Sequence, residues 1–285
     1  MRIGIVGQGF VGSAVYEGLK SFYEIKTYDL DPEKGNCTTL ESLVNDVDVI
    51  FQCLPTPMKK TGECDTRIVE KSLSKIDRLC KNNFSTSGQK KIVIIKSTVL
   101  PGTTDSLNRK FKNVNIIFSP EFLTEANSFE DFKNQTRIIL GGDQSSTTVV
   151  ETMFRRVFPH TTIIKTDTNI AEMVKYFTNC FLASKVMFAN EMYQISQELK
   201  INYDKVVEYS LHDDRIGKSH LSVPGPDGDL GFGGHCFPKD LNAMIYVAHT
   251  AGVDPIVLNA VNKKNNKVRK NRDWEMMKGR AVSEE

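Results

Sequence analysis

The chain has 285 residues, of which 40% are hydrophobic and 25% charged, a composition typical of globular proteins that excludes wholesale disorder. At about 150 residues per domain, this length predicts one large domain or two of modest size. The net charge of +2 gives no reason to expect nucleic acid or a membrane as a partner. No apolar run reaches the roughly 18 residues that a membrane-spanning helix needs.

The six cysteines show no C-x-x-C spacing. We therefore expect no zinc ribbon, no redox pair and no bound metal, and a reducing cytoplasm as the setting. We also expect no secretory signal, because the first apolar run leads directly into a glycine motif.

Short β-branched runs alternate with stretches of helical length in the first half of the chain. Strands are expected at residues 2–6, 25–28, 47–53, 92–96, 115–118, 136–140 and 162–165, with helices between most of them, such as 11–21 and 66–81. Such alternation predicts an α/β fold with a Rossmann-like, doubly wound parallel sheet over residues 1–166.

The pattern then becomes helical. We expect one long helix over residues 169–199, about 45 Å in length, followed by helices at 203–211 and 239–251. A helix of that length bridges domains or packs against a partner chain. Residues 167–265 are thus expected to form an all-helical dimerisation and catalytic domain, and residues 266–285 a basic tail. The charged stretch 263–272 is expected to be a solvated, fraying helix end.

The first strand is followed by a G-x-G-x-x-G motif, which opens a helical pattern as a dinucleotide-binding turn requires. In this context Gly7, Gly9 and Gly12 predict a turn that lets the backbone approach a pyrophosphate. Asp29 ends the next strand, where a carboxylate accepts hydrogen bonds from ribose hydroxyls and repels a 2′-phosphate. NAD is therefore favoured over NADP; Asp31 is a rival for the ribose, but more plausibly begins a turn.

A glycine loop leads to Cys236, just before a predicted helix. A helix N-terminus favours a thiolate, and glycines allow a substrate carbon to come close to the sulfur. For the other five cysteines the default interpretation is a small buried side chain. Cys236 is therefore the candidate nucleophile.

Two further pairs of polar residues each have a structural and a functional interpretation. Lys175 and Asn179 share a face of the long helix, where they face either a ligand or solvent. Glu121 and Glu125 follow a strand, where they contribute to a ligand site or cap the next helix.

Taken together, these features resemble the UDP-glucose/GDP-mannose 6-dehydrogenases, a family of nucleotide-sugar dehydrogenases. Seven motifs occur in the family's order, and the cysteine loop and Pro-Glu-Phe-Leu are the specific ones. They are Gly7 to Gly12; Leu54-Pro55-Thr56-Pro57; Lys96-Ser97-Thr98-Val99 with Pro101-Gly102-Thr103-Thr104; Ser119-Pro120-Glu121-Phe122-Leu123-Thr124-Glu125; Ala171-Glu172-Met173-Val174-Lys175-Tyr176 with Asn179; Asp214-Arg215-Ile216-Gly217; and the Cys236 loop.

This resemblance implies oxidation of a sugar C6 alcohol to a carboxylate with two NAD, through a cysteine thiohemiacetal and thioester. Carried over, the catalytic residues are Cys236, Lys175, Asn179, Asp240, Thr98 and Glu121. The cofactor-binding residues are Gly7, Gly9, Phe10, Val11, Gly12, Asp29, Lys34, Leu54, Pro55, Thr56, Ser97, Thr98, Val99 and Glu125. The substrate-binding residues are Glu121, Phe122, Leu123, Glu125, Lys175, Asn179, Arg215, Phe232 and Gly233.

Arg215 matches a residue that reaches a partner subunit's substrate, which implies a homodimer built on the long helix. Family members continue into a further α/β domain that grips the nucleotide, and this chain stops before it. Two alternatives stay open: a 3-hydroxyacid-type NAD dehydrogenase, which needs no cysteine loop, and a non-catalytic NAD-binding dimeric module.

Overall fold

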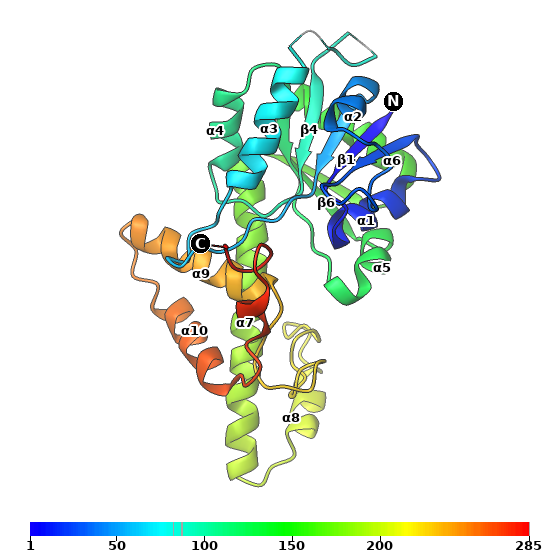
Figure 1. Cartoon of the computed structure of the whole chain (residues 1–285). Helices are drawn as coiled ribbons and strands as arrows, with labels where there is room; N and C mark the ends of the chain where they lie inside the picture. The colour runs from blue at the N-terminus through cyan, green and yellow to red at the C-terminus, as the bar shows by residue number, and fades with distance from the viewer. Residues whose placement is uncertain (82, 87, 285) are drawn as a thin grey trace. The chain divides into compact units, whose positions relative to one another are not determined.

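The computed structural model describes residues 1–81, 83–86 and 88–284. These residues form two compact units (Figure 1). Unit 1 comprises residues 1–56 and 66–175, and unit 2 comprises residues 57–65 and the residues from 176 onward. Helix α7 (Thr168–Glu198) contributes its first part to unit 1 and the rest to unit 2.

Unit 1 is built on a sheet that has seven strands in the described part of the chain, in the order β2-β1-β3-β4-β5-β6-β7. The first five are parallel, so their carboxyl ends share one edge. They are β1 (Ile3–Val6), β2 (Ile25–Tyr28), β3 (Val49–Gln52), β4 (Lys91–Ile95) and β5 (Val114–Phe118). The predicted Rossmann-like α/β class is confirmed.

The last two strands depart from the predicted parallel arrangement. Strand β6 (Arg137–Gly141) is antiparallel to β5, and β7 (Thr162–Thr166) is parallel to β6. The physical reason lies in the connection from β5 to β6, whose longest helix, α5 (Ser128–Lys133), has six residues. Such a helix is about 9 Å long, too short to carry the chain back along a strand of about 17 Å.

Helices cover both faces of the sheet (Figure 1), because side chains along each strand point alternately to the two faces. Ile50 packs in one apolar cluster, with α2 (Leu40–Asp46), α3 (Arg67–Leu79) and α4 (Thr103–Lys110). Its neighbours Val49 and Phe51 pack in the other, with α1 (Phe10–Leu19), α5 and α6 (Gln144–Val157).

Unit 2 is helical, as predicted for the second half of the chain. Its helices after α7 are α8 (Tyr203–Ser210), α9 (Cys236–Thr250) and α10 (Ile256–Val268), with a 3-10 helix, η2, at Asp273–Met276. Their core includes Ala183, Met187, Phe232, Leu241 and Val261. Within the part of the chain that the structure describes, no helix has the length and apolarity that crossing a membrane requires.

The C-terminal segment is packed rather than frayed. The prediction of a solvated helix end is wrong for Val268 and Arg269, both of which are buried, and Trp274 is buried as well. Further along, the N–H of Met58 donates to the carbonyl of Ala281 at 2.8 Å, and the N–H of Ser283 donates to the carbonyl of Met58 at 2.8 Å. The basic residues alone could not reveal this packing, because its partners lie elsewhere in unit 2.

Candidate active site

The glycine turn after β1 has the geometry that a dinucleotide needs. Gly7 has a positive φ of 93°, which L side chains rarely adopt. A Cβ atom on Gly12 would overlap the carbonyl oxygen of Gly7, whereas one on Gly9 would meet no atom within 4 Å. Gly7 and Gly12 therefore shape the turn, and Gly9 leaves open space beside the first turn of α1, where Phe10 and Val11 begin the helix.

Asp29 follows β2 and lies beside this turn. Its carboxylate accepts the N–H of Gln8 at 2.7 Å and that of Asp31 at 2.9 Å, which orients both oxygens. Asp31 instead pairs with Lys34 at 3.1 Å, and this hydrogen bond lowers the pKa of Asp31. Asp29 thus keeps the position expected of a ribose ligand, while the predicted cofactor residue Lys34 is exposed and bound to the rival acid.

The loops after β3 and β4 are joined to each other. The N–H of Leu54 donates to Ser97 Oγ at 2.9 Å, and the hydroxyl of Thr56 donates to the carbonyl of Thr98 at 2.7 Å. Because these strands are parallel, both loops leave the edge of the sheet that also carries the glycine turn. Pro55 is exposed there. Val99 is fully buried in the core, where it supports the loop and offers no surface to a ligand.

A buried ion pair follows β5. Lys175 Nζ lies 2.9 Å from a carboxylate oxygen of Glu121 and donates to the Glu121 carbonyl at 2.7 Å. The second carboxylate oxygen accepts the N–H of Leu123 at 2.7 Å. The ring of Phe122 lies 4.2 Å from the guanidinium of Arg137 and 5.7 Å from Lys175 Nζ. Four predicted site residues are thus brought together in unit 1, whereas Glu125 is exposed on a short 3-10 helix.

Lys96 belongs to the same cluster, although the sequence analysis quoted it only as part of a motif. It donates to the carbonyl of Pro120 at 3.0 Å and to Ser119 Oγ at 3.3 Å. Burial lowers the pKa of Lys96 to about 8, with the Glu121 carboxylate opposing that shift and Lys175 adding to it. The available signal was a lysine that directly continues a strand of buried isoleucines.

Glu172 holds the loop that follows Val99. Its carboxylate is fully buried and accepts the N–H groups of Gly102 at 2.7 Å and Thr104 at 2.8 Å. These N–H groups lie at the start of α4, where an acidic side chain satisfies donors that the helix leaves free. Burial raises the pKa of Glu172 against these hydrogen bonds.

In unit 2, the predicted residues Asn179 and Asp240 are in contact. Asn179 Nδ2 donates to one oxygen of Asp240 at 2.6 Å, and Lys239 forms an ion pair with the other. Burial disfavours the charge of Lys239, but the Asp240 carboxylate together with Cys64 and Cys236 outweighs it, so the pKa of Lys239 is raised. Lys239 was not among the predicted site residues, and its signal was only its place next to Asp240.

Cys236 is the first residue of α9, where the helix N-terminus favours a thiolate. In contrast, burial raises the pKa of the Cys53 and Cys180 thiols to about 12 and that of Cys80 to about 11. None of the six cysteines forms a disulfide, and all six lie in the described residues. The chain therefore sets one thiol apart by its position.

The glycine loop before Cys236 is held by side-chain partners. The N–H of Gly231 donates to Asn190 at 3.0 Å, and that of Phe232 donates to Asn265 at 2.8 Å. Asn265 donates back to the carbonyl of Phe232 at 3.0 Å, and the Phe232 ring is buried in the core. Gly231 and Gly234 both adopt positive φ angles, 73° and 69°. The fold therefore specifies the path of this loop.

Arg215 follows α8 in unit 2. Its side chain is 89% exposed and forms an ion pair with Asp213, with Nε 2.8 Å from a carboxylate oxygen. The described residues contain no group of three His, Cys, Asp or Glu side chains arranged to hold a metal ion.

Unit 1 combines a glycine turn after β1 with an oriented acid after β2, and this combination defines a dinucleotide-binding domain of the Rossmann type. The chain belongs to the UDP-glucose/GDP-mannose dehydrogenase family: the family's NAD binding domain matches residues 34–162, and its central domain matches residues 169–267. NAD is thus confirmed as the cofactor, and the residues around Gly9 and Asp29 fit it.

Individual relatives agree. The UDP-glucose 6-dehydrogenase TuaD of Bacillus subtilis is 32% identical over 84% of this chain and 51% of its own length. The UDP-glucose 6-dehydrogenase of Rickettsia typhi is 32% identical over 77% of this chain and 49% of its own length. This chain thus spans about half the length of these relatives.

Solved structures show the same fold. A UDP-glucose dehydrogenase from Pyrobaculum islandicum matches 93% of this chain and 68% of its own, with a TM-score of 0.84 at 26% identity. A 3-hydroxyisobutyrate dehydrogenase from Mycobacterium tuberculosis matches 94% of both chains, with a TM-score of 0.73 at 15% identity. The second likeness concerns the fold alone.

Proposed function

We propose that this chain oxidises the C6 alcohol of a nucleotide sugar, UDP-glucose or a close analogue, to the carboxylate. The observation that carries the proposal is Cys236, which lies at the N-terminus of α9 after a glycine loop of specified path. A simple alcohol dehydrogenase needs no such thiol, whereas oxidation of an aldehyde to an acid gains from a covalent sulfur intermediate.

The proposed reaction has two oxidations and one hydrolysis. NAD supplies the hydride acceptor, and two NAD are consumed. The alcohol first loses a hydride and a proton to give an aldehyde. The Cys236 sulfur then bonds to the aldehyde carbon and forms a thiohemiacetal, whose oxygen takes up a proton. Loss of a second hydride and proton gives a thioester. Water adds to its carbonyl, the C–S bond breaks, and the acid and the Cys236 thiol are released.

We assign roles to the polar residues by the resemblance to the family. The Lys175 ammonium stabilises a developing oxyanion or exchanges a proton with it, and Asn179 is assigned as a hydrogen-bond donor to the substrate. Glu121 is the acid/base for hydrolysis, and its ion pair with Lys175 supports this role because a buried carboxylate needs such a partner. Asp240 is assigned the ordering of the attacking water.

The test is NADH formation from UDP-glucose by the whole chain and by Cys236→Ala. We expect the variant to lose turnover while its NAD affinity, measured by calorimetry, stays within twofold of wild type. Cys37→Ala is the matched control, because Cys37 is a partly exposed thiol outside the glycine loop, and it should turn over normally. Undiminished turnover in Cys236→Ala would refute the proposed mechanism.

We also propose that the chain forms a homodimer through α7. In unit 2 this helix exposes Phe177, Phe181 and Phe188 by 70%, 60% and 65%, and the first two rings stack at 6.4 Å. A second copy is the occupant we favour, because a stripe along one long helix is self-complementary under two-fold symmetry. In such a dimer the exposed Arg215 would reach the partner's substrate.

Sedimentation of the wild type and of Phe181→Asp tests this assembly. We expect twice the chain mass for the wild type and the single-chain mass for the variant. Tyr209→Asp alters an exposed aromatic residue on α8 and is the comparison that locates the interface on α7. A monomeric wild type would refute the dimer. A cytoplasmic location stays a prediction.

A further inference from the structure

Arg269 is a buried cation in unit 2. It follows α10, its side chain is 1% exposed, and it lies near three carboxylates. Its Nη2 atom is 2.5 Å from Asp227 and 3.9 Å from Asp273, and its Nε atom is 3.6 Å from Asp229. Burial disfavours the charge, but these carboxylates raise the pKa of Arg269, so it stays charged.

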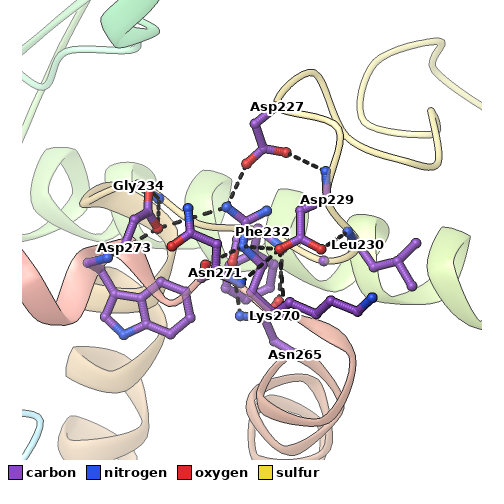
Figure 2. A network of polar contacts seen from close by, with 12 residues as sticks. Asp227, Asp229, Leu230, Phe232, Gly234, Asn265, Lys270, Asn271 and Asp273 are labelled. Atoms are coloured by element: carbon purple, nitrogen blue, oxygen red, sulfur yellow. Dashed lines mark hydrogen bonds and ion pairs between the residues drawn. The ribbon is translucent and has the colours of Figure 1, made fainter.

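The three carboxylates come from two segments of the chain, the turn with Asp227 and Asp229 and the 3-10 helix η2 with Asp273 (Figure 2). Asp227 and Asp229 belong to the turn that leads into the glycine loop. Asp229 also accepts the N–H groups of Leu230 at 2.8 Å and Asn271 at 2.9 Å. The turn before the loop and the segment after α10 are therefore tied to one another around a single guanidinium.

Asp273 reaches the glycine loop itself. Both of its carboxylate oxygens accept the N–H of Gly234, at 3.1 and 3.2 Å (Figure 2). Gly234 lies two residues before Cys236. A hydrogen bond to a charged acceptor is stronger than one between neutral groups, so this contact orients the peptide that leads to the nucleophile.

Gly233 shows how closely these groups approach the loop. A Cβ atom on Gly233 would overlap Nη2 of Arg269 and would lie 2.5 Å from a carboxylate oxygen of Asp273. Gly233 does not have the positive φ of Gly231 and Gly234. Position 233 therefore requires glycine because Arg269 and Asp273 leave no space for a side chain, not because of its backbone conformation.

We infer that Asp273, held by Arg269, is a positioning residue for Cys236: its carboxylate fixes the Gly233–Gly234 peptide and so sets where the sulfur meets the aldehyde carbon. This role rests on the proposed function. Asp273 acts through the loop and lies outside the motifs that mark the chain's family. Asn190 and Asn265 hold Gly231 and Phe232, whereas Asp273 holds Gly234, which is closer to the thiol along the chain.

The test compares Asp273→Ala with Asp273→Asn, which keeps one oxygen to accept the Gly234 N–H, and with Glu275→Ala. Glu275 lies on the same 3-10 helix, is half exposed and pairs with exposed Arg272, so it controls for loss of a carboxylate from this segment. Two properties are measured: hydrogen exchange of the amides of residues 231–236 by NMR, and kcat with KM for NAD in the NADH assay.

We expect Asp273→Ala to speed exchange of the Gly234 amide and to lower kcat, each about tenfold, which corresponds to about 1.4 kcal/mol. Its KM for NAD should stay within twofold of wild type. Asp273→Asn should recover both properties to within about threefold, and Glu275→Ala should match wild type. A merely structural role would lower the melting temperature without this split between kcat and KM.

Unchanged Gly234 exchange in Asp273→Ala overturns the inference, and so does faster exchange with kcat within twofold of wild type. If Asp273→Ala does not fold, Asp273→Ser, whose hydroxyl is too short to span the gap, must show both losses. Hydrogen exchange needs no turnover. A wild type without NADH formation therefore refutes the proposed function alone, whereas unchanged exchange refutes the loop contact alone.

Discussion

Lys96 lies in the interior of unit 1, so the stability of the fold must depend on whether this lysine is charged. Burial lowers its pKa to about 8 from an ordinary value of 10.5, because the interior solvates an ammonium less well than water does. Its partners are a carbonyl oxygen and a hydroxyl rather than a carboxylate in direct contact.

The direction of the effect follows from the two pKa values. Between about pH 8 and about pH 10.5 the unfolded chain binds more protons at this residue than the folded chain, so the free energy of unfolding rises with pH there. The full penalty for the buried charge is about 3 kcal/mol, present below about pH 8. About 2 kcal/mol of it is relieved between about pH 7.5 and about pH 9.5.

Urea unfolding of the wild type and Lys96→Met at those two pH values isolates this contribution, since other titrating groups cancel in the difference. We expect the wild type to gain about 2 kcal/mol relative to Lys96→Met as the pH rises. Lys75→Met removes an exposed lysine and should show no such change. A pH-independent difference between wild type and Lys96→Met would refute the reasoning from burial.

Three further substitutions test the cofactor turn and the Asp240 cluster. Gly12→Ala should destabilise unit 1 by about 1–3 kcal/mol and weaken NAD binding, because its Cβ overlaps the Gly7 carbonyl. Gly9→Ala should weaken NAD binding, because its Cβ would enter the open space beside the glycine turn. It should leave the melting temperature unchanged, because that Cβ meets no protein atom within 4 Å. Equal melting temperatures for Gly9→Ala and Gly12→Ala would contradict this explanation. Asn179→Ala should lower the free energy of unfolding, measured with urea, by about 1.5–3 kcal/mol, because it removes a hydrogen-bond donor from the buried Asp240 carboxylate. The control for Asn179→Ala is Ser184→Ala, further along α7, where the hydroxyl donates only to a backbone carbonyl. An equal loss of unfolding free energy in Ser184→Ala would contradict the cost assigned to the Asn179–Asp240 hydrogen bond.

Features set by local sequence were predictable. Strand β2 occupies residues 25–28 as predicted, and α7 begins and ends one residue before its predicted limits of 169 and 199. Buried β-branched runs, glycine turns and the approach to a long helix are properties of neighbouring residues. The glycine motif and the Cys236 loop belong to this group as well.

Features set by distant partners were not predictable. The reversal of β6 depends on the path of the whole connection from β5 to β6. The burial of Lys96 and Lys239 depends on side chains that the fold brings to them from elsewhere in the chain. Helical spacing also left the buried face of α7 undecided: Cys180 and Met187 face the core, whereas Phe181 does not. Hydrophobicity alone would have placed the phenylalanine inside.

The number of NADH formed per sugar consumed tests the central claim most directly. UDP-glucose is supplied in limiting amount to the whole chain with excess NAD, and NADH and the carboxylate product are measured at completion. The account predicts two NADH for each UDP-glucose, with the acid as the only product. One NADH per sugar, with the aldehyde or ketone as product, would contradict it and favour a simple alcohol dehydrogenase.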